Sequence, residues 1–133
     1  MEKLNISSTH VGLFIRDIET SIQFYCDKLD FVLVHKNKIN TPEGIIKVAF
    51  IRSGDCTIEL VELADYSKRG DGLFDHIAFN VKNIEDVMAK LKERGIVFES
   101  EEITHMPHFF ARGNKWIMFR GPDQEHLEIN EIL

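Results

Sequence analysis

Two histidines and two glutamates occupy equivalent places in the two halves of the chain: His10 and His76, and Glu59 and Glu128. Two neutral imidazoles and two carboxylates form a mixed nitrogen and oxygen ligand set, which suits Zn, Ni, Co, Mn or Fe(II). Four protein ligands leave up to two positions of an octahedron open, where a substrate with two neighbouring oxygens could chelate. Alone, each side chain is typical of a solvated or hydrogen-bonded residue. Together they predict a site for one divalent metal ion.

The equivalence of these residues rests on an internal repeat. The segment THVGLFIRDIETSI lies over DHIAFNVKNIEDVM without gaps at an offset of 66 residues, and FIRSGDCTIELVE lies over FRGPDQEHLEINE at an offset of 69. Loops can absorb the difference of three. The repeat predicts two modules, about residues 8–64 and 73–132, within one domain that spans residues 1–133.

The order of the predicted elements is the same in both modules. Alternating apolar residues predict a strand over 8–15, and helical spacing begins after Asp17, the expected N-cap. The second module has a strand followed by a helix that starts after Asn83 and stops at Gly95. The remaining predicted strands are FVLVHKNKI, IIKVAFIRS and CTIELVE in the first module, FDHIAFNV before the second helix, and IVFESEE, KWIMFR and HLEINEI after it.

This order predicts an α+β fold of two tandem βαβββ modules. A lone four-stranded sheet with one helix leaves one face uncovered, so the modules should pack about a pseudo-twofold axis. We expect two mixed sheets that curve around a metal-binding cleft.

Strand alternation directs the candidate ligands to one side of their sheets. Each glutamate stands between two apolar residues that should face a helix, so its carboxylate leaves the opposite face. The histidines alternate with apolar residues in the same manner. Gly12 and Ala78, two positions after the histidines, leave space for a ligand. The pseudo-twofold axis would bring all four ligands together.

Composition excludes several classes of protein. The 133 residues are 44% hydrophobic and 29% charged, which is typical of one globular domain. The net charge of -6 and the lack of a long basic run argue against nucleic acid as a partner. No apolar stretch approaches about 20 residues, so we expect no membrane span, and without a signal-peptide pattern we expect a cytoplasmic protein. Cys26 and Cys56 should be free thiols.

The other histidines give weaker signals. His35 and His126 are expected at the surface, the first on a strand and the second beside a turn. His105 and His108 lie in ITHMPHFFARGNK, for which a mobile polar loop is favoured over an active-site flap, and the role of this loop stays open.

Several segments together resemble the vicinal-oxygen-chelate superfamily. They are THVGLFIRDIETSIQFYCDKLDF, TIELVE, FDHIAFNV and FRGPDQEHLEI, and the resemblance covers about residues 8–132. The superfamily includes glyoxalase I, methylmalonyl-CoA epimerase, extradiol dioxygenases, and fosfomycin and bleomycin resistance proteins. The resemblance implies paired βαβββ modules, commonly assembled as a homodimer.

The glyoxalase I pattern is the one this chain matches best. It implies that His10, Glu59, His76 and Glu128 bind one divalent metal and that Glu128 is also the catalytic base. In that chemistry the metal acts as a Lewis acid, and a carboxylate moves a proton between adjacent carbons through an enediolate. The resemblance therefore implies a metal-dependent lyase or isomerase for a small α-hydroxycarbonyl or thiol-adduct substrate.

Three departures bear on the substrate. Phe14 stands where glyoxalase I usually has an arginine for glutathione, Lys47 stands where the acyl-CoA epimerase has its second base, and Glu59 stands where that enzyme usually has glutamine. An acyl-CoA epimerase, a dioxygenase and a non-catalytic drug-binding resistance protein remain alternatives. The dioxygenase uses two histidines and one carboxylate, so a fourth ligand argues against it. The identity of the metal and whether the site lies within one chain or between two stay open.

Overall fold

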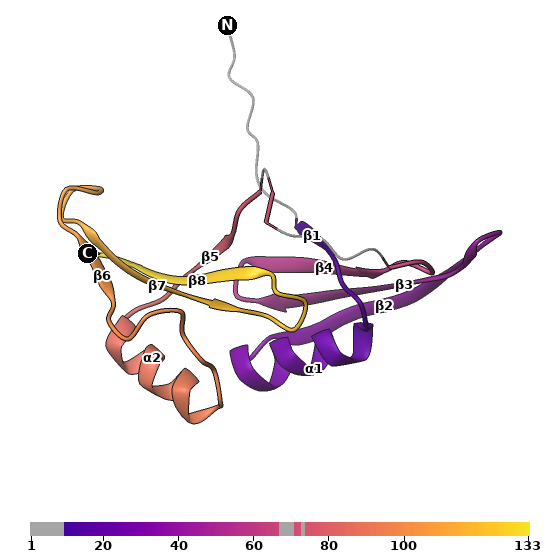
Figure 1. Ribbon diagram of the computed structural model, residues 1–133, viewed down its shortest axis with the longest axis horizontal. Helices are drawn as coiled ribbons and strands as arrows, with labels where there is room; N and C mark the ends of the chain where they lie inside the picture. Colours follow the sequence, from indigo (N-terminus) through magenta and orange to yellow (C-terminus); the bar gives the residue numbers. More distant parts are fainter. Residues whose placement is uncertain (1–9, 67–70, 73) are drawn as a thin grey trace, which may run out of the picture.

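The computed structural model describes residues 10–66, 71–72 and 74–133. Its elements follow one another in the same order in both halves of the chain (Figure 1). They are β1 (Val11–Phe14), α1 (Ile18–Leu29), β2 (Val32–Thr41), β3 (Gly44–Ser53) and β4 (Cys56–Glu62), then β5 (Ile77–Asn80), α2 (Ile84–Glu93), β6 (Thr104–Met106), β7 (Asn114–Arg120) and β8 (His126–Ile132). Neither helix is long and apolar enough to cross a bilayer.

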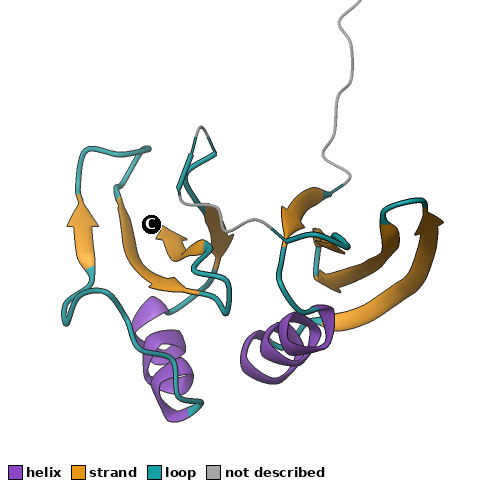
Figure 2. Cartoon of the chain, turned by 45° about the vertical axis from the view of Figure 1, so that its right-hand side comes forward, coloured by secondary structure: helices purple, strands orange, loops and turns teal. Residues whose placement is uncertain are grey.

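The strands form two sheets of identical topology. The orders are β1-β4-β3-β2 and β5-β8-β7-β6, and in each sheet the first strand pairs in parallel with the last strand of its module. The remaining pairs are antiparallel. Both sheets curve, and both helices lie on the same side of them (Figure 2). The predicted α+β fold with two βαβββ modules is confirmed.

The turn before the last strand differs between the modules by one residue. Arg52 lies opposite Thr57 across the first turn, whereas Arg120 lies opposite His126 across the second. The offset of 69 therefore holds for β4 and β8, but β3 and β7 correspond at an offset of 68. The alignment at a single offset of 69 was therefore wrong for β3 and β7, because the second turn contains one more residue than the first.

The repeat extends to the residues that cap the helices. Asp17 accepts a hydrogen bond from the amide of Thr20 at 3.1 Å, as expected of an N-cap. Glu62, at the end of β4, also accepts from the first amide of α1 at 2.8 Å. Asn83 makes no side-chain cap bond; Glu131 of β8 accepts from its amide and from the first amide of α2 at 3.0 and 3.1 Å. A carboxylate from the last strand thus stabilises each helix N-terminus.

The strand predicted over 96–102 is replaced by an irregular segment. Only Phe98 makes an isolated bridge there, to Phe119, while β6 forms further on at Thr104–Met106. The hydroxyl of Ser100 donates to the carbonyl of Glu102 at 3.0 Å, a local bond that competes with strand pairing. The helix before this segment does end as predicted: Gly95 has φ 89° and the following amide bonds back to Leu91.

Helix α1 fastens the first module to the second. One hydrophobic core cluster includes residues of both modules, and the rings of Phe31 and Phe79 meet across the boundary at 5.8 Å. The buried Tyr25 donates its hydroxyl to Glu125, in the turn between β7 and β8, at 3.0 Å. Burial, and then the nearby Glu125 carboxylate, raise the pKa of Tyr25 well above its usual value, so the phenol stays a donor at neutral pH.

Replacing Tyr25 by phenylalanine should therefore weaken the contact between modules. Glu125 would keep a buried oxygen without its donor, which should lower the free energy of unfolding by about 1 to 3 kcal/mol. Urea denaturation of the variant measures this change. The matched control is Tyr66→Phe, whose ring lies 5.9 Å from Arg16 and should change stability little. Equal stability of the Tyr25→Phe and wild-type proteins would contradict the assigned role of this bond.

Candidate metal site

The first pair of predicted ligands comes from two adjacent parallel strands. His10 directly precedes β1, and the register places Gly12 opposite Glu59 of β4. The Nε2 atom of His10 lies 3.6 Å from Oε1 of Glu59. The ring of Phe50 packs edge-on against the imidazole at a centroid distance of 5.3 Å. The pair lies on the sheet face opposite α1.

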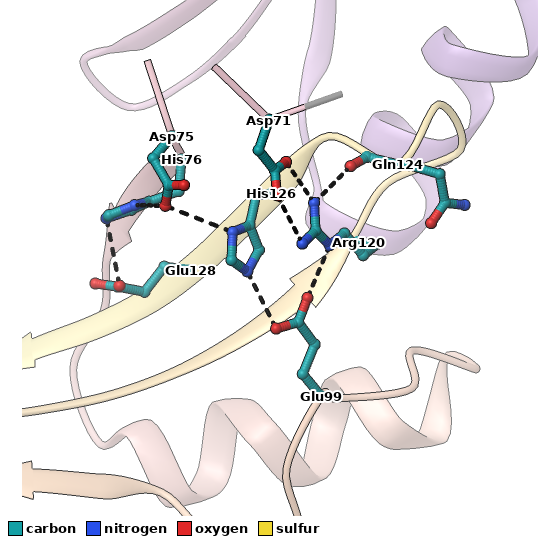
Figure 3. A network of polar contacts seen from close by, with 8 residues as sticks. All are labelled: Asp71, Asp75, His76, Glu99, Arg120, Gln124, His126 and Glu128. Carbon is teal, nitrogen blue, oxygen red and sulfur yellow. Dashed lines mark hydrogen bonds and ion pairs between the residues drawn. The ribbon is translucent and has the colours of Figure 1, made fainter. Parts of the chain in front are cut away.

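The second pair repeats this geometry. His76 directly precedes β5, and Ala78 lies opposite Glu128 of β8. The Nε2 atom of His76 lies 3.5 Å from Oε2 of Glu128 (Figure 3). Two ligands of one ion with bonds of about 2.1 Å stand about 3.0 to 3.5 Å apart, so the second pair, at 3.5 Å, lies at the upper end of this range and the first, at 3.6 Å, lies just beyond it. Donor types and spacing therefore fit a divalent metal ion.

The single chain presents the four residues as two separate pairs. Among the described residues, the His, Cys, Asp and Glu group whose ligand atoms all lie within 4.8 Å of one another is Asp71, Asp75 and His126. No three of the predicted ligands meet that criterion. The metal assignment to His10, Glu59, His76 and Glu128 stays a prediction, and each pair is called a half-site below.

The two carboxylates differ in exposure. The side chain of Glu128 is 10% exposed, against 28% for Glu59. Burial raises the pKa of Glu128, and the nearby His76 and His126 partly oppose this shift. The second half-site therefore contains the less hydrated carboxylate.

The prediction that His126 lies at the surface was wrong. Its side chain is 12% exposed, and its Nε2 lies 3.1 Å from Glu99 while its Nδ1 lies 3.6 Å from Asp75. The sequence held a signal that would have found it: His126 precedes Glu128 by two residues on one strand, so alternation puts both on one face. Asp75 was also missed, although it directly precedes His76 and contacts its Nδ1 at 2.9 Å.

The remaining histidines lie away from these contacts. His35 is exposed on β2, with its ring 6.3 Å from that of Phe50. His105 is exposed on β6, and His108 is exposed in the turn that follows. The structure places both on one hairpin of the second sheet, and the prediction of a mobile loop there remains untested.

Two substrate-related residues lie on different faces. Phe14, at the end of β1, alternates with the helix-facing residues and is 48% exposed. Lys47 pairs with Glu62, its Nζ 3.5 Å from the carboxylate that caps α1. Lys47 is three residues from Phe50, which lies opposite Glu59, so its side chain leaves the other face of the sheet. Lys47 therefore forms an ion pair with Glu62 on the helix side of the sheet.

Comparison with known proteins agrees with the architecture. The family model described as the Glyoxalase/Bleomycin resistance protein/Dioxygenase superfamily matches residues 7–129. The chain belongs to this superfamily. It is 33% identical over 127 residues to a probable lactoylglutathione lyase from Synechocystis sp., covering 90% of this chain and 91% of the relative.

Solved structures of the superfamily share the fold. A glyoxalase family protein from Enterococcus faecalis superposes with a TM-score of 0.77 at 28% identity, covering 94% of this chain and 97% of that one. A fosfomycin resistance protein from Listeria monocytogenes, complexed with Mn(II) and sulfate, superposes with a TM-score of 0.71 at 15% identity, covering 98% and 95%. The second likeness shows the fold alone.

The electrostatics of the second half-site can be measured directly. In the metal-free protein, carbon-detected NMR should show Glu128 titrating above the ordinary glutamate value of about 4.3, because burial disfavours its charged form. The variant His76→Ala removes a group that lowers this pKa, so the midpoint should rise further. A midpoint at or below the ordinary value would show that the carboxylate is better hydrated than its exposure indicates.

Proposed function

We propose that this superfamily member is a metal-dependent, glyoxalase I-like lyase or isomerase that acts on a small α-hydroxycarbonyl or thiol-adduct substrate. The observation that carries the proposal is the pair of matching half-sites, with His–Glu separations of 3.6 and 3.5 Å at repeat-equivalent positions. The related probable lactoylglutathione lyase supports the reaction class.

The metal would be held by two imidazole nitrogens and two carboxylates, from His10, Glu59, His76 and Glu128. This ligand set accepts Zn, Ni, Co, Mn or Fe(II). When bound, the ion would act as a Lewis acid on the substrate oxygens. The Mn(II) complex of the Listeria fosfomycin resistance protein supports a divalent ion in this fold.

Glu128 is the proposed base that moves the proton between adjacent substrate carbons. Its carboxylate is nearly buried, and the residue opposite it in β5 is Ala78, whose short side chain leaves space in front of the carboxylate. A poorly hydrated carboxylate has few waters that compete with a C–H group for its lone pairs. Glu59, the matching residue, is more exposed and would serve as a ligand.

The residues of the proposed site fit a reaction with one catalytic base better than a reaction with two. Lys47, which occupies the position of a second base in the acyl-CoA epimerase, pairs with Glu62 on the helix side of its sheet. Phe14, an exposed apolar residue at the end of β1, replaces the arginine expected for glutathione. These features favour a one-base isomerisation of a small substrate that need not carry glutathione.

The proposed assembly is a homodimer in which each metal site takes one half-site from each chain. It is supported by the way the four residues lie in two separate pairs within one chain. The side chains of His10 and His76 are 37% and 36% exposed in the single chain. Both histidines are therefore accessible to a half-site of a second chain.

Replacing Glu128 by glutamine should remove the base while keeping the fold. Transfer of an α-proton of hydroxycarbonyl substrates, followed in heavy water by NMR, should slow by at least about 100-fold, because the amide cannot accept a proton at neutral pH. The control is Glu101→Gln, an exposed glutamate outside both half-sites, which should keep full activity. If the metal-loaded wild-type protein exchanges no α-proton of any hydroxycarbonyl tested, the proposed reaction is wrong.

Mixing two inactive variants tests whether the site lies between chains. Coexpressed His10→Ala and His76→Ala chains should regain about a quarter of the wild-type metal content and activity, because half of randomly formed dimers are mixed and each mixed dimer has one intact site. Each variant alone should bind little metal. A site within one chain predicts no recovery in the mixture.

A further inference from the structure

The ring of His76 is contacted at both nitrogens, from opposite sides. Its Nδ1 lies 2.9 Å from Oδ2 of Asp75, and its Nε2 lies 3.5 Å from Oε2 of Glu128. An ionised carboxylate can only accept a hydrogen bond, so Nδ1 carries the proton in this contact. A neutral imidazole has one N–H group, which leaves Nε2 with its lone pair directed toward the half-site.

The first half-site has no equivalent contact among the described residues. His10 contacts Glu59 through Nε2, and its ring lies edge-on to Phe50. The repeat places Thr9, which lies outside the described residues, at the position of Asp75, and Thr57 at the position of His126. A carboxylate next to the histidine is therefore a departure of the second module from the repeat.

Asp75 is itself part of a longer chain of contacts (Figure 3). The largely buried His126 lies 3.6 Å from Asp75 on one side and 3.1 Å from Glu99 on the other. Glu99 in turn accepts from Nε of Arg120 at 2.8 Å. His126 and Arg120 lie on strands, so the chain is anchored in the sheet that also presents Glu128.

We propose that Asp75 is the positioning residue of the second half-site: by accepting Nδ1–H of His76, it fixes the ring and its tautomer so that Nε2 faces the metal. The role as a metal-site positioner rests on the proposed function, whereas the effect on the tautomer does not. Carboxylates that accept from the second ring nitrogen of a ligating histidine typically contribute about 10- to 100-fold to metal affinity or activity.

A second cation site on Asp71, Asp75 and His126 is less consistent with the contacts. Their ligand atoms lie within 4.8 Å of one another. However, Arg120 forms a two-pronged ion pair with Asp71 at 2.6 and 3.1 Å, so a positive charge already occupies that carboxylate. The hydrogen bond from Arg120 lowers the pKa of Asp71, as expected for a satisfied pair.

The test compares Asp75→Ala, Asp75→Asn and the matched control Asp71→Ala. The first readout is the tautomer of His76 in the metal-free protein, from nitrogen-15 NMR above the pH at which its ring is protonated. The second is affinity for Zn²⁺, titrated against a chromophoric chelator. Asp71→Ala removes a carboxylate of the same cluster that does not contact His76.

We expect wild-type His76 to carry its proton on Nδ1 and Asp75→Ala to shift it toward Nε2, the form that dominates in free histidine. Zn²⁺ affinity should fall by about 10- to 100-fold in Asp75→Ala, less in Asp75→Asn, whose amide oxygen still accepts, and less than about twofold in Asp71→Ala.

Three results separate the explanations. An unchanged tautomer in Asp75→Ala would overturn the proposal. Equal losses of Zn²⁺ affinity in Asp71→Ala and Asp75→Ala would also overturn it, in favour of a cation held by the cluster itself. A tautomer that shifts in a protein whose wild-type form binds no divalent metal would uphold the positioning of the ring and reject the proposed function.

Discussion

The parallel pairing of the first and last strands of each module is the constraint on which the site depends. It sets Gly12 opposite Glu59 and Ala78 opposite Glu128, so each histidine, two residues earlier, lies beside a glutamate on the same face. Strands that pair in parallel need a long crossover connection, which α1 and two strands supply. The glutamates at the end of β4 and β8 then cap the helices. In each module, the last strand therefore pairs in parallel with the first strand, caps the helix and carries the predicted glutamate ligand.

The two half-sites share a backbone frame and differ in what surrounds the histidine. In the first module, Phe50 packs on the ring of His10. In the second, Asp75 contacts one ring nitrogen of His76, and Glu128 is nearly buried. A duplicated unit can bind one ion with both halves while one half acquires the proton-transfer role. The extra polar residues of the second module match that division.

The sequence was sufficient for features encoded by short-range patterns or by the repeat. The strands CTIELVE and HLEINEI have the predicted bounds, because alternation and flanking turns define them. The strand expected over 96–102 did not form: Ser100 bonds locally to the carbonyl of Glu102, and Glu99 bonds to the distant Arg120. Alternation with Glu128 places His126 on the ligand face, but nothing local indicates that Asp75, before β5, and Glu99, after α2, will lie against its ring. Side-chain contacts between residues that are distant in sequence depend on tertiary packing, which local sequence patterns do not predict.

The one-residue difference between the two β turns connects the fold to the second half-site. The longer turn directs Glu125 inward, where its carboxylate accepts from Tyr25 at 3.0 Å and from the amide of Asp123 at 2.9 Å. A side chain at Gly121 would meet Glu125 within 2.4 Å, so the turn packs too tightly for a larger residue without a shift of Glu125. Directly after this anchored turn, β8 begins with His126. The bond that joins the modules thus also holds the start of the strand that carries His126 and Glu128.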